Sequence, residues 1–317
     1  MLAIVEPIPS ALAGWSRRTA AFSIQLVLLT AVLHRVSWLT TPMAINLFIF
    51  AFALALLALV LGIASVGQIW RLGRSGSWSA AFGIGASLML FAWPAAYVPI
   101  AMDRPAINDI TTDTANPPKF QAVVAQRAPD ANPTTYPGET FAALQAQAYA
   151  DVRPLVVPRS VIETFEIVGD VVERLRWKIV SEQKPDGRGQ PGLIEASDRT
   201  LLLGFTDDII IRVAGSDKEA RIDARSSSRY GRHDLGRNAE RVRRLFKDIW
   251  TRLDESVGGP VAERKGRRDL KRPKERDRVS GVPGKSPASV RSAVPHEPEP
   301  KARRRSRVEA RDRDKPQ

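Results

Sequence analysis

The chain begins with three apolar stretches, each long enough to form a helix that crosses a bilayer. They cover residues 19–39, 43–66 and 79–102. A hydrocarbon core of ~30 Å needs about 20 such residues. The second stretch contains no charged residue, and the third contains Gly83, Gly85 and Pro94, which membrane helices tolerate. We therefore predict a membrane α-helical region of three transmembrane helices over residues 1–102.

The first stretch has an ionisable pair, His34 and Arg35, close to its end. Such a pair inside a membrane marks a candidate functional site. Beside Trp38, at a helix end, the same side chains also reach the interface without any further role, and we favour that interpretation. No small-residue cleavage site follows Arg17 and Arg18 before the next two apolar stretches, so we interpret the first stretch as an uncleaved anchor.

Basic residues of the short loops predict the orientation in the membrane. Two arginines precede the first stretch, and Arg71 and Arg74 separate the second from the third. The opposite side has Arg35 and Arg104 near its helix ends. Because loops rich in Lys and Arg stay in the cytoplasm, we expect a multi-pass protein of the bacterial inner (plasma) membrane, with a cytoplasmic N-terminus and residues 103–317 in the periplasm.

After residue 102 the pattern becomes that of a linker and a soluble domain. Residues 103–140 contain six prolines and few large apolar residues, which predicts an extended spacer. Residues 141–150 are a short helical candidate. Apolar positions recur every three or four residues over 161–177, behind a capping box formed by Ser160 and Glu163.

Four strand-like segments follow, and a final helix ends the domain. The strands are expected at residues 177–182, 193–198, 208–213 and 220–228. The helix is expected at 235–253, with Asp234 as its N-cap. Short connections favour an antiparallel meander with both long helices on one face. The predicted fold is thus an α+β soluble domain over residues 141–255, with a four-stranded antiparallel sheet and two helices.

Charge separates the last part of the chain from the domain. Residues 256–317 contain 19 Lys and Arg against 9 Asp and Glu, a net of +10 out of +13 for the whole chain. This composition cannot bury enough apolar surface to fold, so we expect a basic disordered tail. It is suited to anionic lipid or a cell-envelope polymer. The tail has no aromatic residue for base stacking, which argues against nucleic acid.

Composition also limits the chemistry. The chain has no cysteine, which excludes disulfides, thiolate metal sites and cysteine nucleophiles. No glycine-rich phosphate-binding motif is present. We expect no cofactor and no metal, and we assign no catalytic residue.

Several short motifs lie between residues 193 and 245. They are Asp198-Arg199-Thr200, Gly204-Phe205, Asp207-Asp208, Ser226-x-Ser228-Arg229-x-Gly231 and Asp234-Leu235-Gly236-x-Asn238-Ala239. With them this segment resembles the domain-of-unknown-function family 1499 (DUF1499), and the resemblance extends over about Phe141–Asp254. Members of that family often follow hydrophobic segments, as here. Many begin with a cysteine-containing motif, which this chain lacks. Because the family has no established activity, the resemblance implies a domain and not a function.

The loop that leaves the last strand and enters the last helix is the main candidate site. A helix N-terminus with arginines and hydroxyls beside it can bind a phosphate or a carboxylate. The candidate anion-binding residues are Arg225, Ser226, Ser228, Arg229, Gly231, Asp234 and Asn238. The alternative, which we favour, is that these residues only hold the loop, together with a structural ion network. The network candidates are Asp198, Arg199, Asp207 and Asp208.

Three functions remain open from the sequence. The first is a non-enzymatic envelope protein whose periplasmic domain binds an anionic ligand or a partner protein. The second is a membrane-bound hydrolase-like enzyme using Asp207, Asp208 and His233. The third is a domain that regulates the membrane helices, although the second and third apolar stretches lack the charges of an ion pathway.

Overall fold

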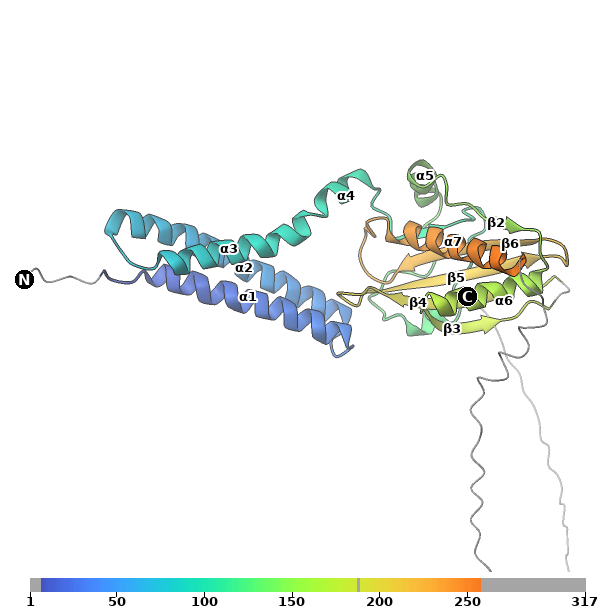
Figure 1. Ribbon diagram of the computed structural model, residues 1–317, viewed down its shortest axis with the longest axis horizontal. Coiled ribbons are helices and arrows are strands. Elements are labelled where there is room, and N and C mark those ends of the chain that lie inside the picture. Colours follow the sequence, from blue (N-terminus) through green and yellow to red (C-terminus); the bar gives the residue numbers. More distant parts are fainter. Residues whose placement is uncertain (1–6, 187–188, 258–317) are drawn as a thin grey trace, which may run out of the picture. The chain divides into compact units, whose positions relative to one another are not determined.

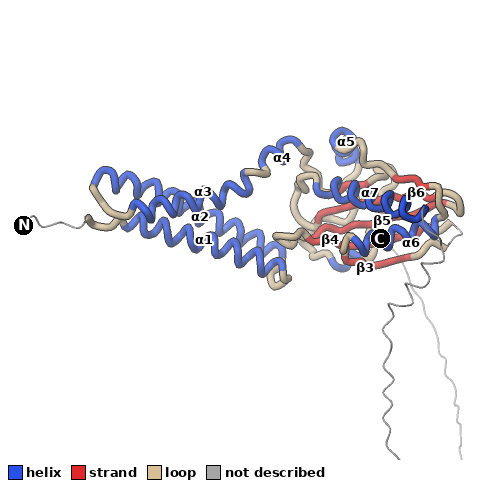
Figure 2. Tube along the Cα trace, viewed as in Figure 1, coloured by secondary structure: helices blue, strands red, loops and turns tan. Residues whose placement is uncertain are grey.

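The computed structural model describes residues 7–186 and 189–257 of the chain. The predicted basic tail lies outside the described residues, apart from its first two positions. The described part comprises an N-terminal helical region and an α+β domain (Figure 1). Helices and strands are separated by colour in Figure 2.

Three long helices and one short helix form the N-terminal region. They are α1 (Ala11–Arg35), α2 (Thr41–Leu72), α3 (Ser77–Ala95) and α4 (Val98–Asp103). The Ser10 side chain caps α1 by accepting a hydrogen bond from the backbone N–H of Ala13. The left-handed Gly73, with φ 60°, ends α2.

Small residues fill the interior of this helical region, and large apolar residues point outward. Alanine, serine and glycine dominate the buried positions of the three long helices. Hydroxyls bond across the interface: Ser16 donates to the carbonyl of Ala58 at 2.7 Å, and Ser23 donates to that of Ala51 at 2.6 Å. Outside, Leu28 is 61 % exposed. This inverted arrangement is typical of helices that pack against each other in lipid.

Two helical stretches of the described residues are long and apolar enough to cross a bilayer, not the three that the sequence predicted. They are Thr41–Leu72 and Ser77–Asp103. The first predicted span is helical in α1, but Arg17, Arg18 and Arg35 leave fewer apolar residues between them than the ~20 that a span needs. Two such helices weakly indicate a membrane anchor.

The sheet of the domain has six strands, and the prediction of four was wrong. The predicted meander is present as β3 (Lys178–Gln183), β4 (Gly192–Arg199), β5 (Thr206–Gly215) and β6 (Ala220–Ser228). Two additional strands, β1 (Asp109–Thr111) and β2 (Leu155–Val157), share the free edge of β6. All pairings are antiparallel. The additional strands have three residues each, too few to show an alternating pattern.

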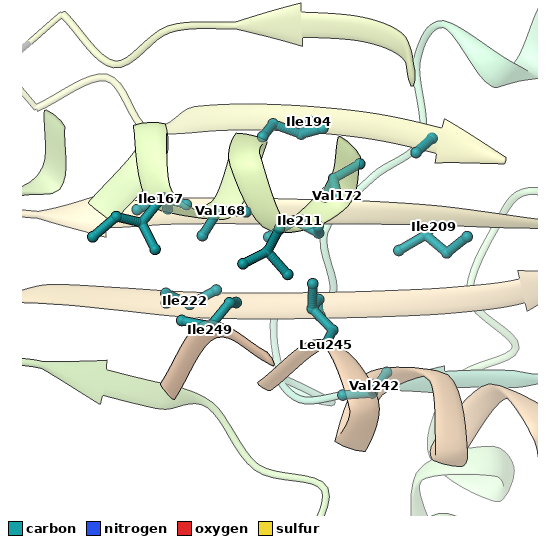
Figure 3. Close-up of a cluster of buried hydrophobic side chains, with 14 of the residues drawn as sticks. Ile167, Val168, Val172, Ile194, Ile209, Ile211, Ile222, Val242, Leu245 and Ile249 are labelled. Atoms are coloured by element: carbon teal, nitrogen blue, oxygen red, sulfur yellow. The ribbon is translucent and has the colours of Figure 1, made fainter. Parts of the chain in front are cut away.

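Helices α6 (Val161–Arg174) and α7 (Arg237–Val257) cover one face of the sheet, as predicted. The main core lies between these helices and the inward side chains of β4, β5 and β6 (Figure 3). In β5, Ile209 and Ile211 point into this core, whereas Ile210 points to the opposite face. A hydrogen bond from Glu163 N–H to Ser160 Oγ shows one half of the predicted capping box.

The opposite face of the sheet is covered by residues 112–138, which we call the cover segment. The sequence predicted an extended spacer here, but the segment packs onto the domain. Phe120 and Val123 are buried against Ile210, and Val123 begins the short helix η1 (Val123–Gln126). The helix α5 (Glu139–Ala148) follows. Six prolines favoured an extended interpretation of residues 103–140, but five of them lie in the cover segment, an irregular layer over the sheet.

Candidate functional site

Arg225 is completely enclosed between the sheet and the cover segment. Its guanidinium forms two hydrogen bonds with Asp109, at 2.9 and 2.7 Å, and others with the carbonyls of Pro118 and Thr134, at 3.0 and 2.8 Å. It lies 4.8 Å from the centre of the Phe120 ring. Only 1 % of Arg225 is exposed. A buried charge is tolerated because it is paired in this way, and no face remains for an external anion.

Arg229 is also bound internally. Its guanidinium contacts both oxygens of Asp208, at 2.8–3.1 Å, and donates to the carbonyl of Gln126. Arg127 of the cover segment approaches Asp208 at 2.8 Å, and Ser197 donates to the same carboxylate at 2.7 Å. Asp208 is therefore a buried acceptor for two guanidinium groups, with a hydroxyl as a third donor.

The face toward α7 has a second polar cluster. Arg241 forms ion pairs with Asp207 at 2.7 Å and with Asp198 at 3.0 Å. It also donates to Ser226 and Asn238, and Ser226 donates to the same Asn238 oxygen at 2.7 Å. These bonds tie the start of α7 to β4, β5 and β6.

The N-terminus of α7 is occupied by a side chain of the protein itself. Asp234 accepts hydrogen bonds from the backbone N–H groups of Gly236, at 2.7 Å, and Asn238, at 3.0 Å. Burial raises the pKa of the Asp234 carboxyl, and the two N–H bonds partly oppose that rise. The carboxylate thus takes the position at which an external anion would bind.

The predicted anion-binding residues are therefore brought together in space, but their polar groups face internal partners. Asn238 Nδ2 also bonds Ser228 Oγ, and the carbonyl of Gly231 accepts from Asn108 and Asn132. Gly231 has φ 90°, in the left-handed region that favours glycine.

The four predicted network residues do not form one network. Asp198 and Asp207 pair with Arg241 toward α7, and Asp208 lies on the opposite face of the sheet. Arg199 contacts none of them and points to the end of α1, where it donates to Ser37 Oγ and to the carbonyl of His34.

The residues of the hydrolase hypothesis do not share one site. Asp207 and Asp208 are adjacent in β5 and therefore point to opposite faces of the sheet. His233 Nδ1 accepts a hydrogen bond from Leu235 N–H, so its Nε2 donates to the carbonyls of Ala101 and Arg104. Both histidine nitrogens are used in holding the β6–α7 loop against the end of α4.

Among the described residues, no group of three or more His, Cys, Asp or Glu side chains could hold a metal ion. A shallow groove of about 370 Å³ lies beside the first half of α7. Its lining residues are Arg104, Trp177, Asp198, Arg237, Glu240, Arg241 and Arg244. Arg237 and Arg244 are exposed, and within the part of the chain that the structure describes neither has an acidic partner.

Important partners escaped the sequence analysis. Asp109 and Arg127 lie in the predicted spacer, where nothing indicated a contact with the sheet. Glu195 was also missed: its buried carboxylate accepts from the N–H groups of residues 121–123, at 2.9–3.0 Å. Arg241 could have been found from the sequence. It lies beside the buried stripe of the last helix, three residues after Asn238, so the two side chains are expected on the same helix face.

Residues 109–249 match the model of a protein family of unknown function (DUF1499), in support of the resemblance found in the sequence. The match begins at Asp109, in β1, and so includes the whole cover segment rather than starting near residue 141. A comparison with curated proteins and one with solved structures gave no significant match.

Proposed function

We propose that this chain is a membrane-anchored, non-enzymatic protein whose domain binds an anionic ligand in the groove beside α7. The observation that carries this proposal is the set of four arginines that line the groove, of which Arg237 and Arg244 are exposed. Of its four arginines, only Arg241 pairs with carboxylates within the ranges that the structure describes. Glu240 bonds Arg243, outside the groove. Three further arginines therefore line a groove of about 370 Å³, which suits a phosphate or carboxylate group.

This proposal moves the anion site away from the loop that the sequence indicated. Arg225 and Arg229 would have to leave buried carboxylates to bind a ligand, and the loss of such pairs is costly. Among the described residues, Arg237 and Arg244 have no such partner to lose. Arg104 uses one nitrogen on the carbonyl of Leu235, at 2.6 Å, and retains other donors.

The anchoring part of the proposal rests on the two apolar helical stretches and on the outward large residues of the bundle. We propose that α1 joins them as a third membrane helix, because it packs against both with small residues. Its apolar stretch is short for a span, and in this proposal the long side chains of Arg18 and Arg35, which bound that stretch, extend to the two interfaces. Basic loops favour a cytoplasmic N-terminus. We therefore propose that the helices lie in a bacterial inner membrane and that the domain lies on its periplasmic side. In this proposal the basic tail binds an anionic lipid or a cell-envelope polymer, and the domain can also bind a partner protein.

Orientation is tested by a reporter fused after Asp254. We expect activity from a reporter that requires the periplasm and none from one that requires the cytoplasm. The opposite result would place the domain inside the cell and would overturn the periplasmic assignment.

The groove is tested with inorganic phosphate and pyrophosphate, titrated calorimetrically into the full chain in detergent. The variant Arg237→Gln with Arg244→Gln is expected to bind at least ~10-fold more weakly, since each charge-assisted hydrogen bond contributes about 1.5–3 kcal/mol. Arg153→Gln with Arg174→Gln removes two charges elsewhere and serves as the control. Equal weakening by both variants would indicate general charge attraction, and no binding to the unmodified chain would contradict the anion site.

A further inference from the structure

The β4–β5 loop presents two neighbouring leucines on an ordered turn. Leu201 and Leu202 are 80 % and 68 % exposed. The turn is fixed by hydrogen bonds between Thr200 and Phe205 and by Gly204, which has φ 75° and donates to the carbonyl of Thr200 at 3.0 Å. Large apolar side chains held outward by such a turn have a defined direction, unlike those of a loose loop.

This loop lies against the end of α1. Arg35 Nε donates to the carbonyl of Leu201 at 3.1 Å, and the His34 ring bonds the carbonyl of Leu203. In return Arg199 donates to the carbonyl of His34 at 3.0 Å. The His34 and Phe205 rings are 5.3 Å apart. His34 and Arg35 therefore join the helical region to the domain, a role that neither interpretation of the sequence included.

The contact places the two leucines at the level of other outward apolar residues. Just after α1, Val36 is 53 % exposed and Trp38 is 79 % exposed. Tryptophan at a membrane helix end is typical of the headgroup region. Arg35 and Arg199 stand beside the leucines, where guanidinium groups can reach lipid phosphates while apolar side chains point into the acyl region.

We infer that the β4–β5 loop is a membrane-inserted loop: Leu201 and Leu202 enter the boundary between the headgroups and acyl chains of the bilayer that holds α2 and α3. The inference rests on the proposed membrane anchoring. The loop then adds a direct attachment to the bilayer to the contacts that His34 and Arg35 make with the domain. The chain leads into the domain from α4, His233 bonds the carbonyls of Ala101 and Arg104, and the leucine loop contacts lipid directly.

The absence of native cysteine makes a site-specific test direct. The full chain is reconstituted in vesicles of phosphatidylcholine and phosphatidylglycerol with a nitroxide on a single introduced cysteine. Collision of the nitroxide with oxygen, which is enriched in lipid, is compared with collision with a water-soluble nickel complex. Leu202→Cys is the test position, and Leu201→Cys replaces it if that variant does not fold.

Two reference positions have similar exposure. Leu56→Cys is in the middle of α2, where Leu56 is 54 % exposed, and Ile162→Cys is in α6, where Ile162 is 51 % exposed. Ile162 belongs to the opposite end of the sheet, since its neighbour Val161 donates to the carbonyl of Ser216 in the β5–β6 hairpin. We expect the label at 202 to favour oxygen severalfold over the nickel complex, in the direction of position 56.

Each other outcome is distinct. A water-like label at 202 with a lipid-like label at 56 overturns the loop insertion alone and leaves the anchor intact. Water-like labels at both positions overturn the anchor and, with it, the insertion. A label at 202 that is shielded from both reagents indicates burial against protein, such as a second copy of the chain, and overturns the lipid contact.

Discussion

Asp109 and Arg225 are 116 residues apart in the chain and meet in a two-point ion pair of 2.9 and 2.7 Å, with both side chains at most 3 % exposed. The pair joins the first strand of the domain to its last one. It also turns the cover segment into a part of the fold, because Arg225 holds two of its carbonyls. The segment is therefore fixed by charge as well as by the packing of Phe120.

Removal of the carboxylate charge should destabilise the domain strongly. Asp109→Asn leaves Arg225 buried without its counter-charge, and we expect the free energy of unfolding to fall by about 3 kcal/mol or more. Urea denaturation of the full chain measures it. Asp151→Asn breaks the Arg243 pair, whose Asp151 side chain is 57 % exposed, and should cost under ~1 kcal/mol. Similar losses from both variants would contradict the buried role of Asp109.

Replacing either of two glycines by alanine should change the stability of the domain, in opposite directions at the two positions. Gly236 has φ 79°, which is strained for a residue with a Cβ, and an added Cβ would also displace the Arg104 side chain, so Gly236→Ala should cost at least about 1–2 kcal/mol. Gly169 is inside α6 with nothing within 4 Å of an added Cβ, so Gly169→Ala should stabilise the domain by about 0.5–1 kcal/mol. Thermal unfolding of both variants shows whether each unfolding temperature rises or falls relative to the unmodified chain. A stabilising Gly236→Ala would show that the left-handed turn before α7 is not required.

Asp234 should make the domain less stable as the pH rises. Its folded pKa is raised by burial above the ordinary value of 3.8, so the folded state binds the proton more tightly than the unfolded state does. Stability from this group is therefore present below pH 3.8 and is lost as the pH rises through the folded pKa. Asp234→Asn keeps a capping side chain without the titration.

The stability of Asp234→Asn relative to the unmodified chain should consequently increase from about pH 4 toward neutral pH. Urea denaturation of both proteins across that range measures this difference, in which the titration of other groups cancels. A difference that falls with pH would mean that the hydrogen bonds to Gly236 and Asn238 outweigh the burial.

Tyr136 should remain protonated well above the usual range. Burial raises its pKa to about 12, and the Asp109 charge contributes in the same direction. Its buried hydroxyl has no hydrogen-bond partner in the described structure, so Tyr136→Phe should leave stability at neutral pH unchanged or slightly higher. Because the folded state favours the neutral phenol, the unmodified domain should lose stability between pH 10 and 12 relative to this variant. An ultraviolet titration that shows Tyr136 ionising near pH 10 would contradict the burial.

Repeating patterns made most of the helices and the long strands predictable. The apolar stripe of α6 and the alternation in β6 follow from local sequence, and the structure contains both. The last helix begins at Arg237, two residues later than predicted, because Leu235 and Gly236 are left-handed; Asp234 still accepts a hydrogen bond from Asn238 N–H in its first turn. β1 and β2 were not predictable in this way. They form because β6 offers an open edge to segments that are distant in sequence, which is a tertiary effect with no local signature.

The candidate site was only half predictable for a related reason. Arginines, serines and a helix start at residues 225–238 do suggest an anion site, and the structure brings these residues together. Whether their charges are free depends on partners such as Asp109 and Arg127, which belong to a proline-rich segment with no periodicity. The sequence therefore locates the positive charges but does not show where their counter-charges lie.

The double occupation of the β6 edge has a consequence for how the domain can meet other chains. Since β1 and β2 together use the edge of β6, the sheet ends on that side in two strands of three residues each, which are too short to pair well with an extended peptide. On the other side the sheet ends in β3. β3 is interrupted by a bulge between Ile179 and Ser181 and begins with Lys178, features that discourage pairing between edges. The domain is thus built against strand exchange and sheet-to-sheet aggregation, and partners are expected to recognise its side chains rather than its backbone.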